Sequence, residues 1–347
     1  MGTLRVTGTI DIHQFWPLDS SDADTTKLQL LINNKSFQYR KTGSKTFKTT
    51  NAYVGAVSKG QGTKAVITIS KKTGEQSITC RLQGVDAPEL HYKASALKTK
   101  PSITQTMRDV FNKNNKDRRQ YYAQSSTVAL AKHLKKFADK NGIVKAVFET
   151  EVDSPADAVD TYGRFVGNIR IGKKLDINLW LVENGWGHPA FYTSMSNEEI
   201  AAFLNAWKKG KAKSGRPGRS LSKDAGSFDW KLLYNEPHKD AVIKFAIGDD
   251  KGKVLMPKIF RRQVAWMVSK KAKVIDSSIK FTDYLKEKPD QLVLLDDFLA
   301  NSINSATVRY LHEFVVKSKV IKNPEEMVFT EKAGTVVDTN GQKLVSW

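Results

Sequence analysis

The stretch I-T-C-R-L-Q-G-V-D-A-P-E (78–89) gathers one arginine and two carboxylates. Arg81 lies on the polar side of an alternating pattern that predicts a half-buried strand. Gly84 permits a break in that strand and the following proline disfavours a helix, so we expect a turn where Asp86 and Glu89 occur. An arginine fork suits a phosphate, and carboxylates can hold a hard cation or accept a proton from water. A strand-end salt bridge before an ordinary turn explains the same residues equally well.

Two other motifs could add charged groups to this chemistry. Asp22 and Asp24 lie in an acidic loop that leads into a predicted strand. Such a loop either caps its own backbone or forms a cation site, and both interpretations stay open. Arg164, in D-T-Y-G-R (160–164), is either an exposed residue after a hairpin turn or a second arginine beside Arg81.

These motifs must be positioned by a mixture of strands and helices. Alternating patterns predict strands over 4–12 and 143–149, in addition to the strand that carries Arg81. Apolar residues at helical spacing predict helices over 121–138, 175–184 and 197–211.

The charge of the chain is strongly positive and uneven. The 347 residues carry a net charge of +20; residues 226–347 contain 20 Lys/Arg and 16 Asp/Glu, and the remainder contains 36 and 20. The net charges of these parts are therefore +4 and +16, which favours a polyanionic partner for the first part. No apolar run suits a membrane span, so we expect no membrane partner. Without a signal-peptide core we expect a cytoplasmic protein, and a trimmed secreted form stays open as the alternative.

Together the motifs resemble the staphylococcal nuclease family. The resemblance rests on four motifs and their order, R-L-Q-G-V-D-A-P-E (81–89), D-T-Y-G-R (160–164), N-L-W-L-V-E-N-G-W-G (178–187) and D-A-D-T-T-K-L (22–28). It implies an α+β fold, a five-stranded OB-type β-barrel with packed helices. The expected organisation is a nuclease-like domain over 1–212 with insertions at about 35–77 and 91–120, a linker over 213–228, and a smaller, mainly helical C-terminal domain over 229–347 that ends in a β-hairpin.

The resemblance also implies residue roles in catalysis. Arg81 and Arg164 would clamp the phosphate, and Glu89 would position or deprotonate the attacking water. Tyr162 would lie along the nucleotide. The implied reaction is in-line hydrolysis of a phosphodiester that leaves 3′-phosphate ends.

A Ca²⁺ cofactor is implied in the same way. Its ligands would be Asp24, Asp86 and the backbone carbonyl of Ala87, where the family usually has threonine. A competing alignment places Lys64 at the first ligand position. We favour Asp24, because lysine cannot ligate a cation.

The expected insertion after Glu89 is rich in basic residues. Between Lys93 and Arg119 it contains eight Lys/Arg and two Asp. It is either a solvated loop or a guide for the substrate backbone, in which case Lys113, Lys116, Arg118 and Arg119 would bind substrate.

The C-terminal part, 229–347, carries no recognised motif. A helix is expected to begin at Pro257, with Phe260 and Val264 on an apolar stripe and Arg261 on another face. Further predicted elements are helices near 281–287, 295–303 and 307–316 and a hairpin over 335–345. A winged-helix DNA binder and a surface that docks a protein partner are both compatible with this pattern.

Two functions from different classes follow. The first is a Ca²⁺-dependent nuclease acting on DNA, RNA or both. The second is a non-catalytic nucleic-acid-binding OB-fold module, which could lose a charged residue of the set without harm. All five charged positions can be filled here, which favours the nuclease. A protein-interaction scaffold would leave the charge of +16 unexplained.

Overall fold

The structure is a computed structural model that describes residues 2–15, 21–51, 53, 57–60, 62–212, 217–226, 254–317, 319–331, 334–338 and 340–347. The chain forms two compact units. The barrel unit consists of Met1–Val85, Thr127–Leu181 and Glu331–Trp347, and the second unit consists of Asp86–Ser126 and Val182–Thr330. Strand β9 (Gly84–Asp86) and helices α3 (Ala123–Leu134) and α4 (Ile177–Glu183) each begin in one unit and end in the other.

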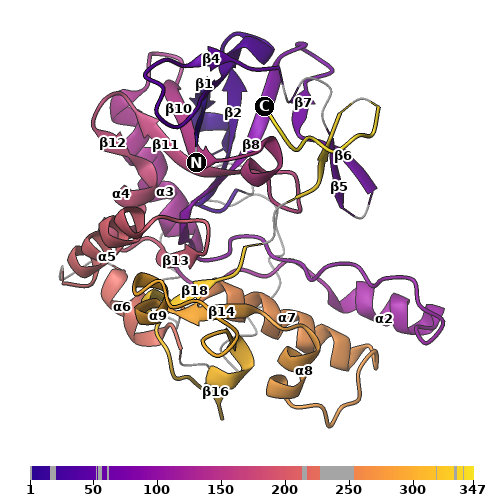
Figure 1. Cartoon of the computed structure of the whole chain (residues 1–347). Coiled ribbons are helices and arrows are strands. Elements are labelled where there is room, and N and C mark those ends of the chain that lie inside the picture. Colours follow the sequence, from indigo (N-terminus) through magenta and orange to yellow (C-terminus); the bar gives the residue numbers. More distant parts are fainter. Residues whose placement is uncertain are drawn as a thin grey trace. The chain divides into compact units, whose positions relative to one another are not determined.

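Five strands close a barrel in the barrel unit (Figure 1), and in ring order they are β1 (Gly2–Asp11), β2 (Thr25–Leu30), β8 (Gln76–Leu82), β11 (Phe165–Ile171) and β10 (Ile143–Val152). Neighbours are antiparallel except β8 and β11, and β10 pairs with β1 along its whole length to complete the ring. Closure leaves no unpaired edge among these strands. The predicted OB-type barrel with adjoining helices is confirmed.

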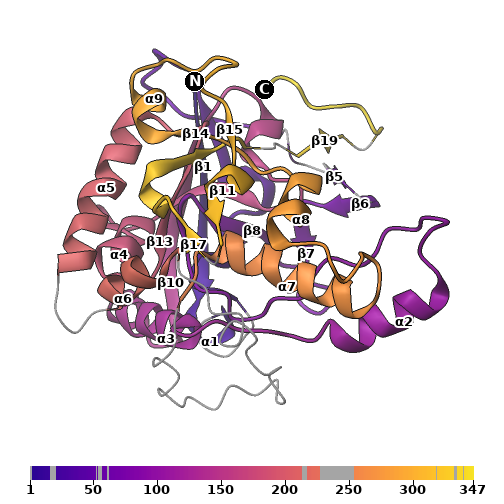
Figure 2. The same ribbon diagram turned by 90° about the horizontal axis from the view of Figure 1, so that it is seen from below.

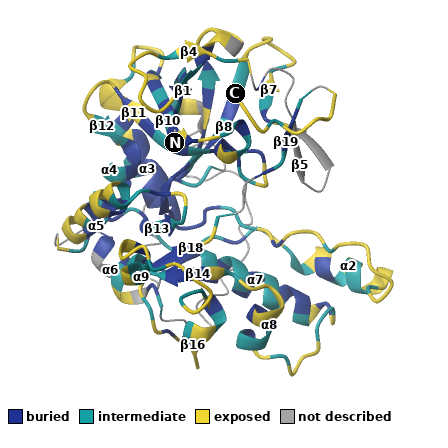
Figure 3. Ribbon diagram, in the orientation of Figure 1, coloured by how far each residue is buried: buried dark blue, intermediate teal, exposed yellow. Residues whose placement is uncertain are grey.

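Residues along the barrel strands alternate between buried and partly exposed positions (Figure 3). Ile78, Cys80 and Leu82 of β8 are buried, as the sequence pattern predicts, and Arg81 between them is partly exposed. Gly84 then adopts a φ of 76°, a left-handed conformation that glycine tolerates without a steric penalty. The strand therefore ends where the sequence predicts a break.

Much of the expected insertion at 35–77 is paired with the barrel rather than looped away from it. Strand β3 (Phe37–Arg40) pairs with β1 and with β4 (Lys48–Thr49), and β7 (Ile67–Ile69) pairs with β8. Strands β5 (Val57–Gly60) and β6 (Gly62–Ala65) form a separate sheet with β19 (Val336–Val337). The remaining short elements of this unit are α1 (Ile12–Phe15), β12 (Leu175–Asp176) and the 3₁₀ turns η1 (Asn33–Ser36), η2 (Lys135–Phe137) and η3 (Pro155–Ala158).

The C-terminal tail packs within the barrel unit. Leu344 donates a backbone hydrogen bond to Val336, so a tight hairpin forms in the predicted range. The ring of Trp347 stacks on Tyr39 at 4.0 Å between centroids, and its Nε1 donates to the carbonyl of Asp153. The tail thus belongs to a different compact unit from the helices that precede it.

The second unit combines helices with a small sheet. Its helices are α2 (Gln105–Asn114), α5 (Asn197–Ala212), α6 (Gly218–Asp224), α7 (Pro257–Lys271), α8 (Phe281–Glu287) and α9 (Leu295–Leu299). Its strands and 3₁₀ turns are β13 (His188–Tyr192), β14 (Gln291–Leu294), β15 (Arg309–Tyr310), β16 (Val315–Val316), β17 (Lys319–Val320), β18 (Met327–Phe329), η4 (Leu311–Phe314) and η5 (Pro324–Glu326). Within the unit, neighbouring strands run in the order β15-β14-β18-β13, and α7 lies beside α8 (Figures 1 and 2).

The expected basic insertion and the C-terminal part share one hydrophobic core. Phe111 of α2 packs in the same cluster as Phe260 and Val264 of α7 and Tyr284 of α8. The apolar stripe predicted for the helix at Pro257 is thereby explained.

No helix of the described residues is long and apolar enough to cross a membrane.

Two details of the second unit differ from the sequence expectations. Residues 307–316 form β15, η4 and β16 instead of a helix, because their β-branched and aromatic side chains suit strand pairing. The expected linker, 213–228, includes helix α6, and its residues 213–216 and 227–228 lie outside the described residues. The compact units divide elsewhere, so a domain boundary at this linker stays a prediction.

Candidate active site

Arg81 is paired with Asp24 inside the barrel unit. Strand register places Thr25 opposite Arg81, so Asp24 comes next to the arginine at the end of β2. The two side chains form an ion pair, and Asp24 is almost completely buried. The amide of Leu82 also donates to the carbonyl of Asp24, at 2.8 Å. The strand pairing of the barrel therefore brings these two predicted site residues together.

Arg164 is held by an aspartate of its own turn. Asp160 accepts hydrogen bonds from the amides of Tyr162 and Arg164, both at 2.9 Å, and from the Nε of Arg164 at 2.8 Å. Gly163, with a φ of 79°, makes the tight turn possible. The Tyr162 side chain is exposed, and its ring centroid lies 5.4 Å from the Arg164 guanidinium carbon.

Asn178 links strand β11 to the segment that follows β8. It is fully buried, and its amide group donates to the carbonyls of Gln83 at 2.8 Å and Gly167 at 3.0 Å. Its carbonyl oxygen accepts from the amide of Ile169. Because one side chain bonds both β11 and the segment after β8, it limits movement of the backbone near Arg81.

Asp86, Ala87 and Glu89 lie in the second unit, and all three are buried. Gln120 anchors this segment through two hydrogen bonds to the backbone of Glu89. Its side-chain oxygen accepts from the Glu89 backbone amide at 3.0 Å, and its backbone amide donates to the Glu89 carbonyl at 2.7 Å. The Gln120 side-chain nitrogen donates to the carbonyl of Leu255 at 3.0 Å.

Arg261 of helix α7 contacts both carboxylates of this segment. Its Nη1 forms an ion pair with Glu89, and its two terminal nitrogens lie 3.4 Å from the two Asp86 oxygens. Burial opposes the charge on Arg261, but the nearby Asp86 and Glu89 outweigh that effect and raise the pKa of the guanidinium above its usual value. A permanent cation therefore lies against the predicted metal ligand and the predicted base.

In this arrangement the predicted ligands do not fit a Ca²⁺ ion. Asp24 forms an ion pair with Arg81, and Asp86 contacts Arg261. Among the residues that the structure describes, no three His, Cys, Asp or Glu side chains are grouped so that they could hold a metal ion. Lys64 of the competing alignment lies in β6, which pairs with β5 in a sheet separate from the barrel.

The comparisons with known proteins concern the segment that contains most of these residues. The family model described as "Staphylococcal nuclease homologue" matches residues 79–218 of the 347. The chain contains a staphylococcal nuclease-like domain. The matched segment includes Arg81, Asp86, Glu89 and Arg164, whereas Asp24 and Arg261 lie outside it. A search of curated proteins found no match.

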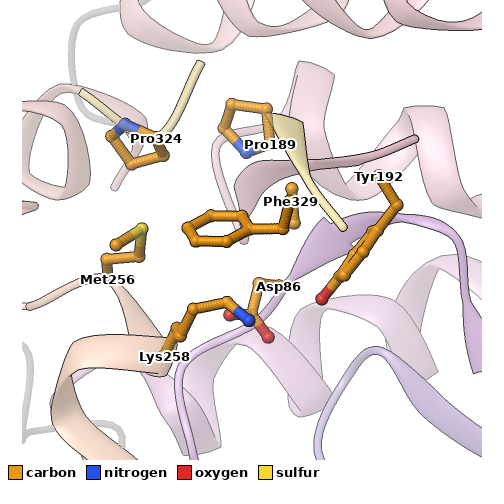
Figure 4. Close-up of a pocket in the computed structure, with 8 residues that line it drawn as sticks. Asp86, Pro189, Tyr192, Met256, Lys258, Pro324 and Phe329 are labelled. Carbon is orange, nitrogen blue, oxygen red and sulfur yellow. The ribbon is translucent and has the colours of Figure 1, made fainter. Parts of the chain in front are cut away.

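A small pocket adjoins Asp86 in the second unit. Asp86, Lys258 and Tyr192 are its polar lining residues, and Phe329 is among its apolar ones (Figure 4). The Lys258 Nζ lies 4.3 Å from the centroid of the Phe329 ring and 3.9 Å from an oxygen of Asp290. The pocket is therefore lined both by residues of the segment that matches the family and by Lys258 in the first turn of α7.

The four basic residues predicted to bind substrate have different exposures. Lys113 and Lys116 are exposed at and after the end of α2, Arg119 is half-buried, and Arg118 is buried. The backbone of Arg118 pairs with that of Tyr92 through two hydrogen bonds. Arg118 is thus part of the packing of the segment, and the two lysines face solvent.

Three residues of this arrangement received no role from the sequence. Asp160 stands inside a motif that was recognised, and its Asx-turn pattern was a usable signal. Gln120 and Arg261 had no local signal, because their partners lie 31 and 172 residues away in the chain.

Proposed function

We propose that the nuclease-like domain hydrolyses phosphodiester bonds of nucleic acid. The observation that carries the proposal is the complete charged set, with Arg81, Glu89 and Arg164 all present in the segment that matches the family. Carboxylates hold both arginines in place, Arg81 through Asp24 and Arg164 through Asp160. Arginines fixed in this way stabilise the negative charge that develops on the phosphate in the transition state better than mobile arginines, since they need less reorganisation during the reaction.

The proposed step is attack of water on phosphorus in line with the leaving group. Glu89 accepts the proton of the water as the new phosphorus–oxygen bond forms. The bond to the 5′-oxygen breaks, and that oxygen takes a proton from solvent, which leaves a 3′-phosphate. Arg81 and Arg164 stabilise the charge that accumulates on the phosphate oxygens.

Calcium enters this proposal through the family resemblance. Asp24, Asp86 and the Ala87 carbonyl offer the oxygen ligands that Ca²⁺ prefers, but the arginine contacts described above occupy both carboxylates. We therefore assign the ion no step, and its requirement is a separate question for experiment.

The direct test is incubation of the full chain with single- and double-stranded DNA and RNA, with Ca²⁺ and with a chelator. Cleavage that produces 3′-phosphate ends supports the proposal, and activity that persists in chelator would remove calcium from it. The Glu89→Gln variant serves as the control for contaminating nuclease. No cleavage of any substrate would overturn the proposed hydrolysis.

A second candidate is a nucleic-acid-binding module without turnover. The observation that favours it is the contact of Arg261 with both Asp86 and Glu89, which reduces the negative charge of the carboxylates. Binding measured by fluorescence anisotropy with no cleavage under any condition would select this function. The net charge of +16 on residues 1–225 is compatible with both candidates.

A further inference from the structure

Arg261 reaches Asp86 and Glu89 as a fork across two acidic side chains. Its Nη1 contacts both carboxylates, and its Nη2 lies 3.4 Å from Asp86 Oδ2. The Asp86 and Glu89 residues are 3% and 6% exposed, while 29% of the Arg261 side chain is exposed. Carboxylates this deeply buried require a nearby positive charge to offset their lost hydration.

The second unit holds both sides of this contact in place. On one side, Gln120 bonds the backbone of Glu89 and, through its side chain, the carbonyl of Leu255 just before α7. On the other side, Phe260 anchors α7 in the hydrophobic core. Arg262, the next residue, makes a two-point ion pair with Asp290, with both distances at 2.7 Å. The backbone position of Arg261 is therefore fixed by the packing of its neighbours.

We propose that Arg261 is a built-in cation that holds Asp86 and Glu89 in place of a divalent metal ion and competes with that ion for them. A guanidinium and a metal ion cannot occupy the same carboxylate oxygens, so metal binding requires Arg261 to withdraw. The apparent affinity for the ion is lowered by the fraction of molecules in which Arg261 is bound. As a regulatory feature of the active site this inference rests on the proposed function, but its test uses metal binding.

The test compares Ca²⁺ binding by the wild-type chain and by Arg261→Gln, using calorimetric titration and thermal unfolding. If Arg261 is bound in nine-tenths of the molecules or more, the variant should bind Ca²⁺ with a Kd lowered about tenfold or more. Its melting temperature should fall without metal and recover when Ca²⁺ is added, but not with NaCl of equal ionic strength. Arg262→Gln is the matched control, since it loses a partly buried ion pair on the same helix and should gain no Ca²⁺ affinity.

Two more variants keep the proposal falsifiable. Asp86→Asn added to Arg261→Gln should abolish the gained affinity, which separates this site from other Ca²⁺ sites. If Arg261→Gln does not fold, Arg261→Lys retains the charge but loses the fork and should show a smaller gain in the same direction.

Equal Ca²⁺ affinity in the wild type and both Arg261 variants would overturn the proposal. So would a loss of nucleic-acid affinity in Arg261→Gln at unchanged Ca²⁺ affinity, since it would make Arg261 a substrate contact. Failure of the proposed function is distinguishable from these results. A chain that cleaves nothing can still show the change in Ca²⁺ affinity, and a chain that cleaves in chelator can still lack it.

Discussion

Each compact unit contains a carboxylate–arginine group that involves predicted site residues, and the two groups differ in the source of the arginine. Asp24 and Arg81 come from neighbouring strands of the barrel and meet through the register of β2 and β8. Asp86 and Glu89 meet Arg261, which lies on α7 outside the segment that matches the family. The barrel group needs only the strands of the barrel unit, whereas the second group depends on helix α7 in the C-terminal part of the chain.

This difference indicates that the C-terminal part contributes directly to the environment of Asp86 and Glu89. Strand β18 pairs with β13, which belongs to the matched segment, and Phe111 and Phe260 share one core. Helix α7 and strand β18 of the C-terminal part are therefore integrated into the second unit. Variants in the two groups should have different consequences.

The largest expected effect is on catalysis in the barrel group. Arg81→Gln should lower the single-turnover cleavage rate at saturating Ca²⁺ by about 10²–10⁵-fold, because it removes a fixed charge that stabilises the transition state. Arg5→Gln, which loses a surface ion pair to Glu149 on the same barrel, is the control and should cleave normally. An Arg81 variant that is folded and cleaves at the parental rate would remove Arg81 from the mechanism.

The next effect concerns the proposed base in the second group. Glu89→Gln should lower the cleavage rate by about 10²–10⁴-fold, since glutamine has nearly the same shape but cannot accept the proton. Nucleic-acid affinity, measured by anisotropy, should remain within about twofold of the parental value, because the phosphate clamps are unchanged. Parental turnover in this variant would show that another group activates the water.

A smaller effect should appear as a dependence of stability on pH. His188 of β13 is fully buried, and burial lowers its pKa to about 4, although Asp86 acts in the opposite direction. Below the ordinary pKa of about 6.5 the unfolded chain binds a proton that the folded chain excludes, so stability is lost as pH falls toward 4. Between pH 7 and pH 5 the unfolding free energy should fall by about 2 kcal/mol from this residue.

The matching experiment is urea unfolding of the wild type and His188→Gln at both pH values. The variant should lose about 2 kcal/mol less than the wild type over this interval. Equal losses would show that His188 does not exclude the proton.

The smallest effect concerns Lys113 and Lys116, the exposed lysines at and after the end of α2. Neutralising Lys113 and Lys116 together should weaken nucleic-acid binding and reduce the salt slope by up to about one log–log unit per lost phosphate contact. The rate at saturating substrate should not change. Neutralising Lys208 and Lys209 together, two exposed lysines on α5, is the charge-matched control. An unchanged salt slope would make the α2 segment an ordinary solvated surface.

Local patterns predicted the barrel strands but not the first carboxylate–arginine group. Alternation identified β1 and β8, and the break after Leu82 followed from Gly84. Asp24 was placed before a predicted strand as a metal ligand, and its ion pair with Arg81 depends on the pairing of that strand with β8, which was not predicted. The features that were predicted depend on residues close in sequence.

The second group could not be predicted, because its determinants are long-range. On a helix with an apolar stripe, Arg261 and Arg262 look equivalent, and only tertiary packing directs one to Glu89 and the other to Asp290. The basic insertion gave a similar ambiguity, since the pattern did not show that Arg118 is buried and Lys113 exposed. Charge composition identifies an ionic surface but does not choose the partners of its members.

The proposed competition with a metal ion depends on the contact between Arg261 and Glu89, which a double-mutant cycle on unfolding free energy measures. The cycle uses Arg261→Gln, Glu89→Gln and the double variant, and it should give a coupling energy of about 1–3 kcal/mol, because the two side chains form a partly buried ion pair. A parallel cycle that replaces Arg262 in place of Arg261 should be additive to within about 0.5 kcal/mol. Additive effects of Arg261→Gln and Glu89→Gln would contradict the account.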